Sequence, residues 1–444
     1  MSDIHITPEL MEAVERGDFH PDVLRELEWS HLMHLCPTCR AGARAWLERA
    51  QGRSKNNGAA LQVLPFVLAR HTVDEEEKAT QAERDLCDLL QLPQEERLAK
   101  IERARRRFRG VLLAHRLLNE AKRQVPGQPQ EAHDLAEAAE KVLLRTPHSP
   151  GYFDALTRAA AYRANALRAG GRLREAAERM ACARSFIRHE HVTELLVYAE
   201  VDWLEGVLRK DERRPQEAEA LLTRSAALFE LAGEKTEASR PLLALGAMYH
   251  HQQQLAKAIE TTEAALAFLG PESEPRLYLC GRHNLALFYV ESGRYEAAAA
   301  LLTDDEALYQ EFPDRWTTLR KLWLAGKIAL RTGELADAET AFLHVRSGFL
   351  EQGISYDAAM VSLDLALVYL QQSRTTELKT LAEEMHAVFA SEDVHREAVA
   401  ALLLFQNAAR REAVTSELVE EMITYLRRAR GNPAMQFQAL EDGK

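Results

Sequence analysis

Apolar residues recur every three or four positions along most of this chain. In the clearest unit, residues 239–252 form one such stretch and residues 255–269 a second, with a short polar break between them. This spacing places the apolar side chains along one face of a helix. No stretch alternates apolar and polar residues as a half-buried strand would. The pattern therefore predicts an all-α protein built from pairs of helices.

Small residues repeat in register with these pairs. One column of small residues recurs every 40 residues: Gly206, Gly246, Ala286, Gly326 and Ala366. Ala164 lies 42 residues before Gly206 and begins this column. A second column of alanines lies twelve residues after these small residues: Ala176, Ala218, Ala258, Ala298 and Ala338. Leu378 occupies this position in the next unit. Fixed-period self-similarity of this kind indicates a repeat architecture. Small residues are needed where two helix axes cross closely, and Gly293 and Gly333 are expected to form the turns within pairs, where positive φ is cheap for glycine.

The spacing Leu245-Gly246-x-x-Tyr249, followed by Ala258 and, in another unit, by the large apolar Phe342, resembles the tetratricopeptide repeat (TPR). The period of 40 is longer than the common period of about 34. The resemblance covers residues 155–381, and residues 394–428 are predicted to form one more degenerate pair. It implies a right-handed α-solenoid whose first helices line a concave groove that binds a protein or peptide.

A cysteine pair near the N-terminus has the spacing of a metal site. Cys36 and Cys39 are separated by two residues, and His31 and His34 lie shortly before them, so that thiolates and imidazoles suited to Zn²⁺ come together. The segment 29–40 resembles the zinc-binding motif of bacterial anti-sigma factors. His31 is five residues from Cys36 rather than the usual four, and no fourth ligand is evident. A zinc site, a helical module that folds without metal and a redox pair all remain open.

These features predict the organisation of the whole chain. Its predicted parts are a small helical anti-sigma-type zinc-finger-like module at 1–50, a linker and connecting helix at 51–94, an irregular helical pair at 95–150, a TPR-like solenoid at 151–430 and a tail at 431–444.

Composition narrows the class of protein. The 444 residues carry 56 Lys and Arg against 68 Asp and Glu, a net charge of −12, which argues against bulk binding to polyanions. Five cysteines are too few for a disulfide scaffold. The N-terminus has no basic region followed by an apolar core, and the longest apolar stretch, near residues 59–69, is shorter than the roughly 20 residues of a membrane span. We expect a cytoplasmic protein that does not enter a membrane.

The predicted groove residues are first-helix positions that lie off the packing stripe. They are Asn165, Arg168, Trp203, His250, His251, His283, Arg320, Trp323, Lys327 and Arg331. This set is basic and aromatic although the chain is acidic overall, and it favours an acidic peptide or a free C-terminal carboxylate. The alternative is that the charges only solvate helix faces and that Trp323 belongs to the core.

A dense basic run lies on a predicted helix and comprises Arg103, Arg105, Arg106, Arg107 and Arg109. It is suited to contact phosphates, but it lacks a helix-turn-helix pattern, and a solvated helix face is the simpler interpretation. No phosphate-binding loop, nucleophile elbow or metalloprotease motif is present, so we expect a protein that is not an enzyme. The sequence predicts an interaction adaptor or scaffold. The alternatives are a signalling or transcription regulator whose N-terminal module engages a sigma factor, and a nucleic-acid binder that uses the basic run.

Overall fold

The computed structural model describes residues 77–147, 149, 151–188, 192–390, 405–410 and 413–430. These ranges contain helices, turns and bends but no strand, which confirms the all-α prediction for them. The chain divides into two compact units, residues 1–194 (unit 1) and residues 195–444 (unit 2). The predicted N-terminal module and the C-terminal tail lie outside the described residues. No helix in the described part is long and apolar enough to cross a membrane.

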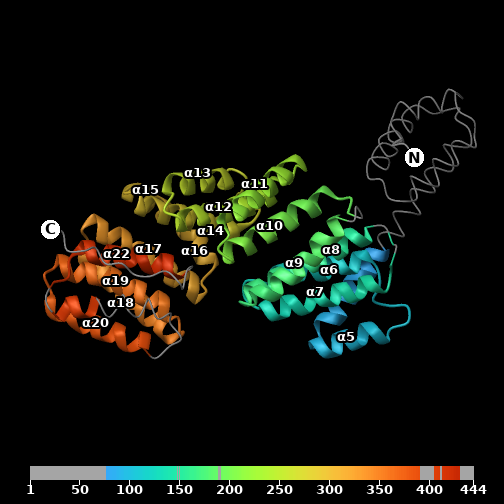
Figure 1. Cartoon of the computed structure of the whole chain (residues 1–444), viewed down its shortest axis with the longest axis horizontal. Coiled ribbons are helices and arrows are strands. Elements are labelled where there is room, and N and C mark those ends of the chain that lie inside the picture. The colour runs from blue at the N-terminus through green and yellow to red at the C-terminus, as the bar shows by residue number, and fades with distance from the viewer. Residues whose placement is uncertain are drawn as a thin grey trace, which may run out of the picture. The chain divides into compact units, whose positions relative to one another are not determined.

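Unit 1 contains antiparallel helices that pack in chain order (Figure 1). After a helical stretch at residues 77–90, its helices are α5 (Gln94–Arg103), α6 (Val111–Gln124), α7 (Pro129–Leu144), α8 (Tyr152–Ala169) and α9 (Leu173–Arg188). α6 packs on α7, α7 on α8 and α8 on α9, so α7 and α8 are buried between their neighbours.

Unit 2 continues the pattern of paired helices. Its helices are α10 (Leu195–Asp211), α11 (Pro215–Leu231), α12 (Lys235–His251), α13 (Leu255–Leu266), α14 (Pro275–Glu291), α15 (Tyr295–Asp304), α16 (Glu306–Glu311), α17 (Arg315–Thr332), α18 (Leu335–Glu351), α19 (Ser355–Gln371), α20 (Thr375–Ala390) and α22 (Ser416–Arg430). From α12 to α19, each first helix packs on its own second helix and on the second helix of the preceding pair. Each of these pairs therefore buries apolar faces against its neighbours.

The small residues lie where the two helices of a pair cross, as predicted. A Cβ added at Gly206, Gly246 or Gly326 would fall 2.7, 2.3 or 2.7 Å from the side chain of the residue 16 positions later. These partners are Leu222, Thr262 and Phe342, each on the second helix of the same pair. A glycine at these positions therefore sets the separation between the paired helices.

The turns within the pairs also follow the 40-residue period. Gly293 and Gly333 have φ values of 81° and 88°, which confirms the prediction for them. The equivalent positions in other pairs hold Arg213, Gln253 and Ser373, with φ values of 64°, 62° and 58°. The left-handed conformation is thus kept even where the residue is not glycine and pays a steric cost for it.

Two local predictions were wrong. The first helix of the 239–269 unit begins at Lys235, before the predicted residue 239, and the second helix ends at Leu266, before the predicted residue 269. The basic run is not helical beyond Arg103, where α5 ends. The next residues are bent, with the aromatic ring of Phe108 buried and its φ at 56°. Beside Phe108, Arg107 bonds Asp85 and Asp88 of the residue 77–90 helix.

Candidate functional site: the first-helix face

The candidate site is a stripe along the first helices of unit 2. We define the first-helix face as residues 200, 203, 207 and 211, together with the residues 40, 80, 120 and 160 positions later. Steps of three and four keep these residues on one side of each helix. Most of them on α10, α12, α14 and α17 retain some exposure to solvent. The predicted groove residues of unit 2 belong to this face, except for His250, which borders it. Asn165 and Arg168 lie on α8 of unit 1, where Arg168 Nε donates to Asn165 Oδ1 at 3.0 Å.

Several predicted groove residues join adjacent first helices. His250 Nε2 lies 2.8 Å from Glu291 Oε2, and its ring stacks on Phe288 with 4.7 Å between centroids. Trp323 Nε1 donates to Asp364 Oδ2 at 2.7 Å, and Lys327 forms a buried ion pair with the same carboxylate. The sequence predicted that these side chains line a ligand-binding groove. The structure gives each of them a partner in the next repeat, so they also join successive repeats.

Three other predicted groove residues, Trp203, His251 and Arg331, make contacts of a different kind from these buried bonds. Trp203 lies under the guanidinium of Arg240, 5.8 Å from ring centroid to Cζ. His251 is exposed beside His250. Arg331 Nη2 lies 3.0 Å from Glu420 Oε1 of α22, so this predicted groove residue contacts the chain's own C-terminal helix.

The centre of the face combines a neutral imidazole with a cation. His283 Nδ1 lies 2.8 Å from Tyr309 Oη. Burial and, to a smaller extent, the positive charge of Arg320 together lower the pKa of His283 to about 3, so the ring is uncharged at neutral pH. Cys280, one turn earlier, has solvent-exposed surface, yet protein surrounds it closely enough that desolvation raises the pKa of its thiol.

Arg320 is the unpaired cation of this centre. Its neighbours Arg276 and Lys321 have carboxylate partners, Asp314 at 2.7 Å and Glu306 at 2.5 Å. Within the residues that the structure describes, Arg320 has no ion pair or hydrogen bond, and its guanidinium lies 5.7 Å from the ring centroid of Trp316. A half-buried guanidinium over an aromatic ring keeps its donors available for an anionic group.

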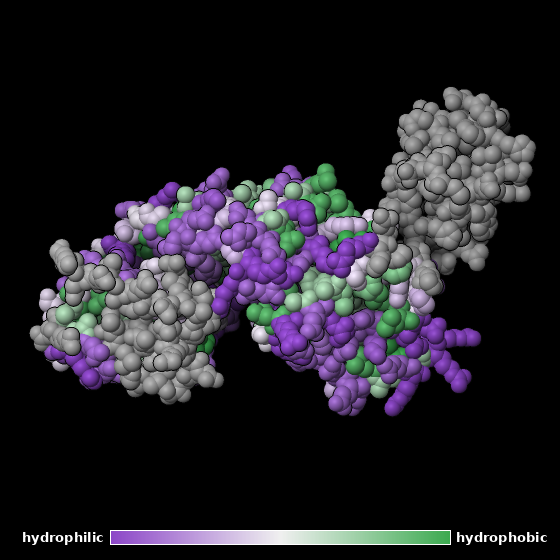
Figure 2. Space-filling model, viewed as in Figure 1, coloured by the Kyte–Doolittle hydropathy of each residue, from purple (hydrophilic) through white to green (hydrophobic). Residues whose placement is uncertain are grey.

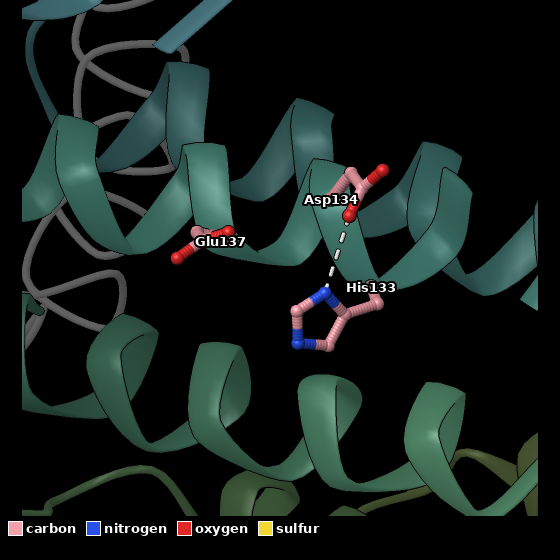
Figure 3. A group of neighbouring side chains, drawn as sticks. All are labelled: His133, Asp134 and Glu137. Carbon is pink, nitrogen blue, oxygen red and sulfur yellow. Dashed lines mark hydrogen bonds and ion pairs between the residues drawn. The ribbon is translucent and has the colours of Figure 1, made fainter. Parts of the chain in front are cut away.

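A second candidate lies on α7 in unit 1. His133, Asp134 and Glu137 hold their potential ligand atoms within 4.8 Å of one another. Figure 3 shows the imidazole directed at Asp134, with His133 Nδ1 3.2 Å from Asp134 Oδ1. The guanidinium of Arg163 lies 3.4 Å from both His133 Nε2 and Glu137 Oε1. Because a fixed cation already takes these acceptors, the cluster is an ion-pair network between α7 and α8 and is poorly suited to a metal ion.

Arg107 of the basic run forms ion pairs, and other arginines of the run are exposed to solvent. Arg107 bonds Asp85 at 2.6 Å and Asp88 at 2.5 Å, and these carboxylates raise its pKa. Arg105 and Arg106 are exposed. In Figure 2, hydrophilic residues cover much of the coloured surface and hydrophobic residues are scattered among them.

The zinc candidates His31, His34, Cys36 and Cys39 lie outside the described residues, and the site stays a prediction.

No family model and no curated protein matches this chain. Among solved structures, it is similar to the apo form of RapI, with a TM-score of 0.54 and 14% identity over 71% of this chain and 86% of that one. It is also similar to a Rap protein complexed with competence and sporulation factor, with a TM-score of 0.55 and 12% identity over 72% of this chain and 88% of that one. At such identities the likeness establishes the fold, a TPR-like helical solenoid.

Proposed function

We propose that this chain is a non-enzymatic regulator that binds an acidic protein segment or peptide on the first-helix face of unit 2. The observation that carries the proposal is Arg320, a half-buried cation without a carboxylate partner among the described residues. A carboxylate placed there would gain charge-assisted hydrogen bonds in a partly desolvated site. The similar Rap protein, which is complexed with a factor, supports a binding role for this fold.

The residues around Arg320 suit recognition rather than chemistry. The neutral ring of His283 adds no repulsion toward Arg320, and the raised pKa of Cys280 makes its thiol a weak nucleophile at neutral pH. Trp316 offers an aromatic surface beside the cation, 38% exposed. We infer that a ligand places a carboxylate on Arg320 and an apolar side chain against Trp316.

The test uses two pools of fluorescein-labelled hexapeptides, one rich in Asp and Glu and the other rich in Lys and Arg, each made with a free or an amidated C-terminus. Fluorescence anisotropy with the full chain would measure binding. Loss of a charged hydrogen bond, worth roughly 1.5–3 kcal/mol, predicts that Arg320→Gln weakens binding of the acidic pool by about 10- to 100-fold. Comparing the free and amidated forms distinguishes a terminal carboxylate from an acidic side chain.

Arg294→Gln is the matched control. Arg294 is also stacked on an aromatic ring, 5.4 Å from the centroid of Tyr289, but it lies at the turn between α14 and α15. It should leave peptide binding unchanged. Equal binding of acidic and basic pools, or wild-type binding by Arg320→Gln, would refute the proposal.

A further inference from the structure

α19 carries apolar, buried residues on its first-helix face, unlike α17 before it. Its three central positions on the first-helix face are Met360, Leu363 and Leu367, which are 4%, 0% and 3% exposed. The equivalent residues of α17 are Arg320, Trp323 and Lys327, all with polar atoms. An apolar helix face must be covered by other apolar residues. The two neighbouring second helices, α18 and α20, pack against other sides of α19, so the first-helix face needs a further cover.

α22 provides that cover. It packs on α19, and its buried residues Val419, Met422, Ile423 and Leu426 belong to the same apolar cluster as Met360, Leu363 and Leu367. The spacing of three, one and three residues gives α22 a single apolar stripe. In Figure 1, α22 lies beside α17 and α19 at the C-terminal end of the chain.

Two polar contacts fix how α22 lies on the face. Glu420, near the start of α22, pairs with Arg331 at the C-terminal end of α17. Further along α22, the carbonyl oxygen of Leu426 accepts a hydrogen bond from Tyr356 Oη at the N-terminal end of α19. α22 therefore passes from the end of one first helix to the beginning of the next. It lies over the surface that the repeat pattern assigns to a ligand.

α22 also has the features of a helix that can form by itself. Thr415 caps its N-terminus by accepting a hydrogen bond from the Leu418 N–H at 3.2 Å. The N-terminal backbone and Thr415 lower the pKa of Glu417, as expected for a carboxylate at the positive end of a helix. One oxygen of Glu421 is buried with no hydrogen-bond partner in the described part of the chain, which disfavours the docked position.

We propose that α22 is a built-in, displaceable occupant of the first-helix face of α17 and α19. Its docked state shields an apolar helix-binding surface. That surface is selective for a helix with apolar residues at positions i, i+3, i+4 and i+7 and an acid at i+1, the pattern of residues 419–426. Release of α22 would extend the open face from α17 onto α19. The inference rests on the packing of α22 and not on the proposed acidic ligand at Arg320.

The test is binding of a fluorescein-labelled peptide of residues 413–430 to two full-length proteins. In the wild type, α22 of the same chain occupies the first-helix face of α17 and α19, so the peptide should bind weakly or not at all. In Met422→Asp/Ile423→Asp the cis helix cannot dock, and the same peptide should bind at least tenfold more tightly. A peptide carrying the same two substitutions is the negative control. Absence of peptide binding to the double variant would overturn the proposal, provided that its circular dichroism matches the wild type.

Two further measurements keep the test decisive if the double variant folds poorly. A Glu420→Arg peptide should bind about two- to fivefold more weakly than the parent peptide, as expected for an exposed ion pair, and Arg331→Glu in the protein should reverse that order. In the wild-type chain, hydrogen exchange should show α22 amides opening while α18 amides stay protected. Exchange of α22 and α18 at one common rate would show α22 to be an inseparable part of the solenoid. None of these readouts uses an acidic hexapeptide, so failure here is distinct from failure at Arg320.

Discussion

The crossing of α12 and α13 allows a steric prediction with its own internal control. Gly246 is buried in α12, and a Cβ placed on it would lie 2.3 Å from Thr262 Oγ1 and 3.3 Å from the carbonyl oxygen of Ala258. The first distance is about 1 Å too short for ordinary contact. Alanine at this position must therefore push the two helices apart or force Thr262 to another rotamer, and overpacking of this kind costs roughly 1–3 kcal/mol.

The helix propensity of alanine partly offsets the steric destabilisation caused by Gly246→Ala. Alanine is favoured over glycine in a helix interior by about 1 kcal/mol. Gly246→Ala alone should therefore change the stability of unit 2 by a net loss of about 0–2 kcal/mol. Thr262→Ala removes the clashing hydroxyl, which is buried without a hydrogen-bond partner in the described part of the chain. In that background the propensity gain is opposed only by the close approach to the Ala258 carbonyl oxygen, so Gly246→Ala should lie between neutral and a stabilisation of about 1 kcal/mol.

The double-mutant cycle isolates the steric term because the helix propensity of alanine is common to both backgrounds. We expect a coupling of roughly 1–3 kcal/mol between positions 246 and 262. Urea unfolding followed by circular dichroism would measure it, with hydrogen exchange of α12 and α13 to locate the change if the array does not unfold in one step. An identical effect of Gly246→Ala in both backgrounds would refute the crossing geometry. The larger Gly246→Leu should also reduce the cooperativity of melting in the adjacent repeats.

Three further outcomes test other parts of unit 2. Asp364→Ala should destabilise the chain by roughly 3 kcal/mol, because it removes the carboxylate that pairs with buried Lys327, while Asp364→Asn should retain part of the stability; urea midpoints measure both. His283 binds a proton more weakly when folded, with a pKa of about 3 against 6.5 when unfolded, so stability present above pH 6.5 should fall as pH drops toward 3. His283→Gln should remove that component, and its stability difference from wild type should therefore shrink between pH 7.5 and pH 5. At pH 8, iodoacetamide should modify Cys87 and Cys182 before Cys280, whose thiol pKa is raised, and equal rates by peptide mapping would contradict the desolvation at Cys280.

The repeat could be predicted from sequence because its signals are local and periodic. The small-residue column and the helical spacing both reflect packing within one pair, and the structure places Gly246 where the pattern requires. The turns could be predicted only in part, because residues other than glycine also adopt positive φ. Arg213, Gln253 and Ser373 adopt the same conformation, and only their 40-residue spacing could have identified them.

The candidate site was harder to predict because its residues depend on contacts between repeats. A single sequence shows that Trp323 lies on the first-helix face, but not that Asp364, 41 residues later, accepts its N–H group. The same holds for His250 and Glu291. The sequence predicted a helical pair at residues 394–428, which includes most of α22. Its packing on α19 had a further signal in the apolar residues at the central first-helix positions of α19.

The bonds between successive first helices have a practical consequence for redesign. Replacing His250, Trp323 or Lys327 to obtain a new ligand preference would also loosen the junction between two repeats, so affinity and foldability would change together. Cys280 and Arg320 have no such bond to a neighbouring first helix among the described residues. A combinatorial library restricted to these two positions could alter specificity while the contacts between successive first helices are kept. Their 40-residue equivalent on α12, Arg240, is excluded because it contacts Trp203 of α10 and Glu274 at the start of α14.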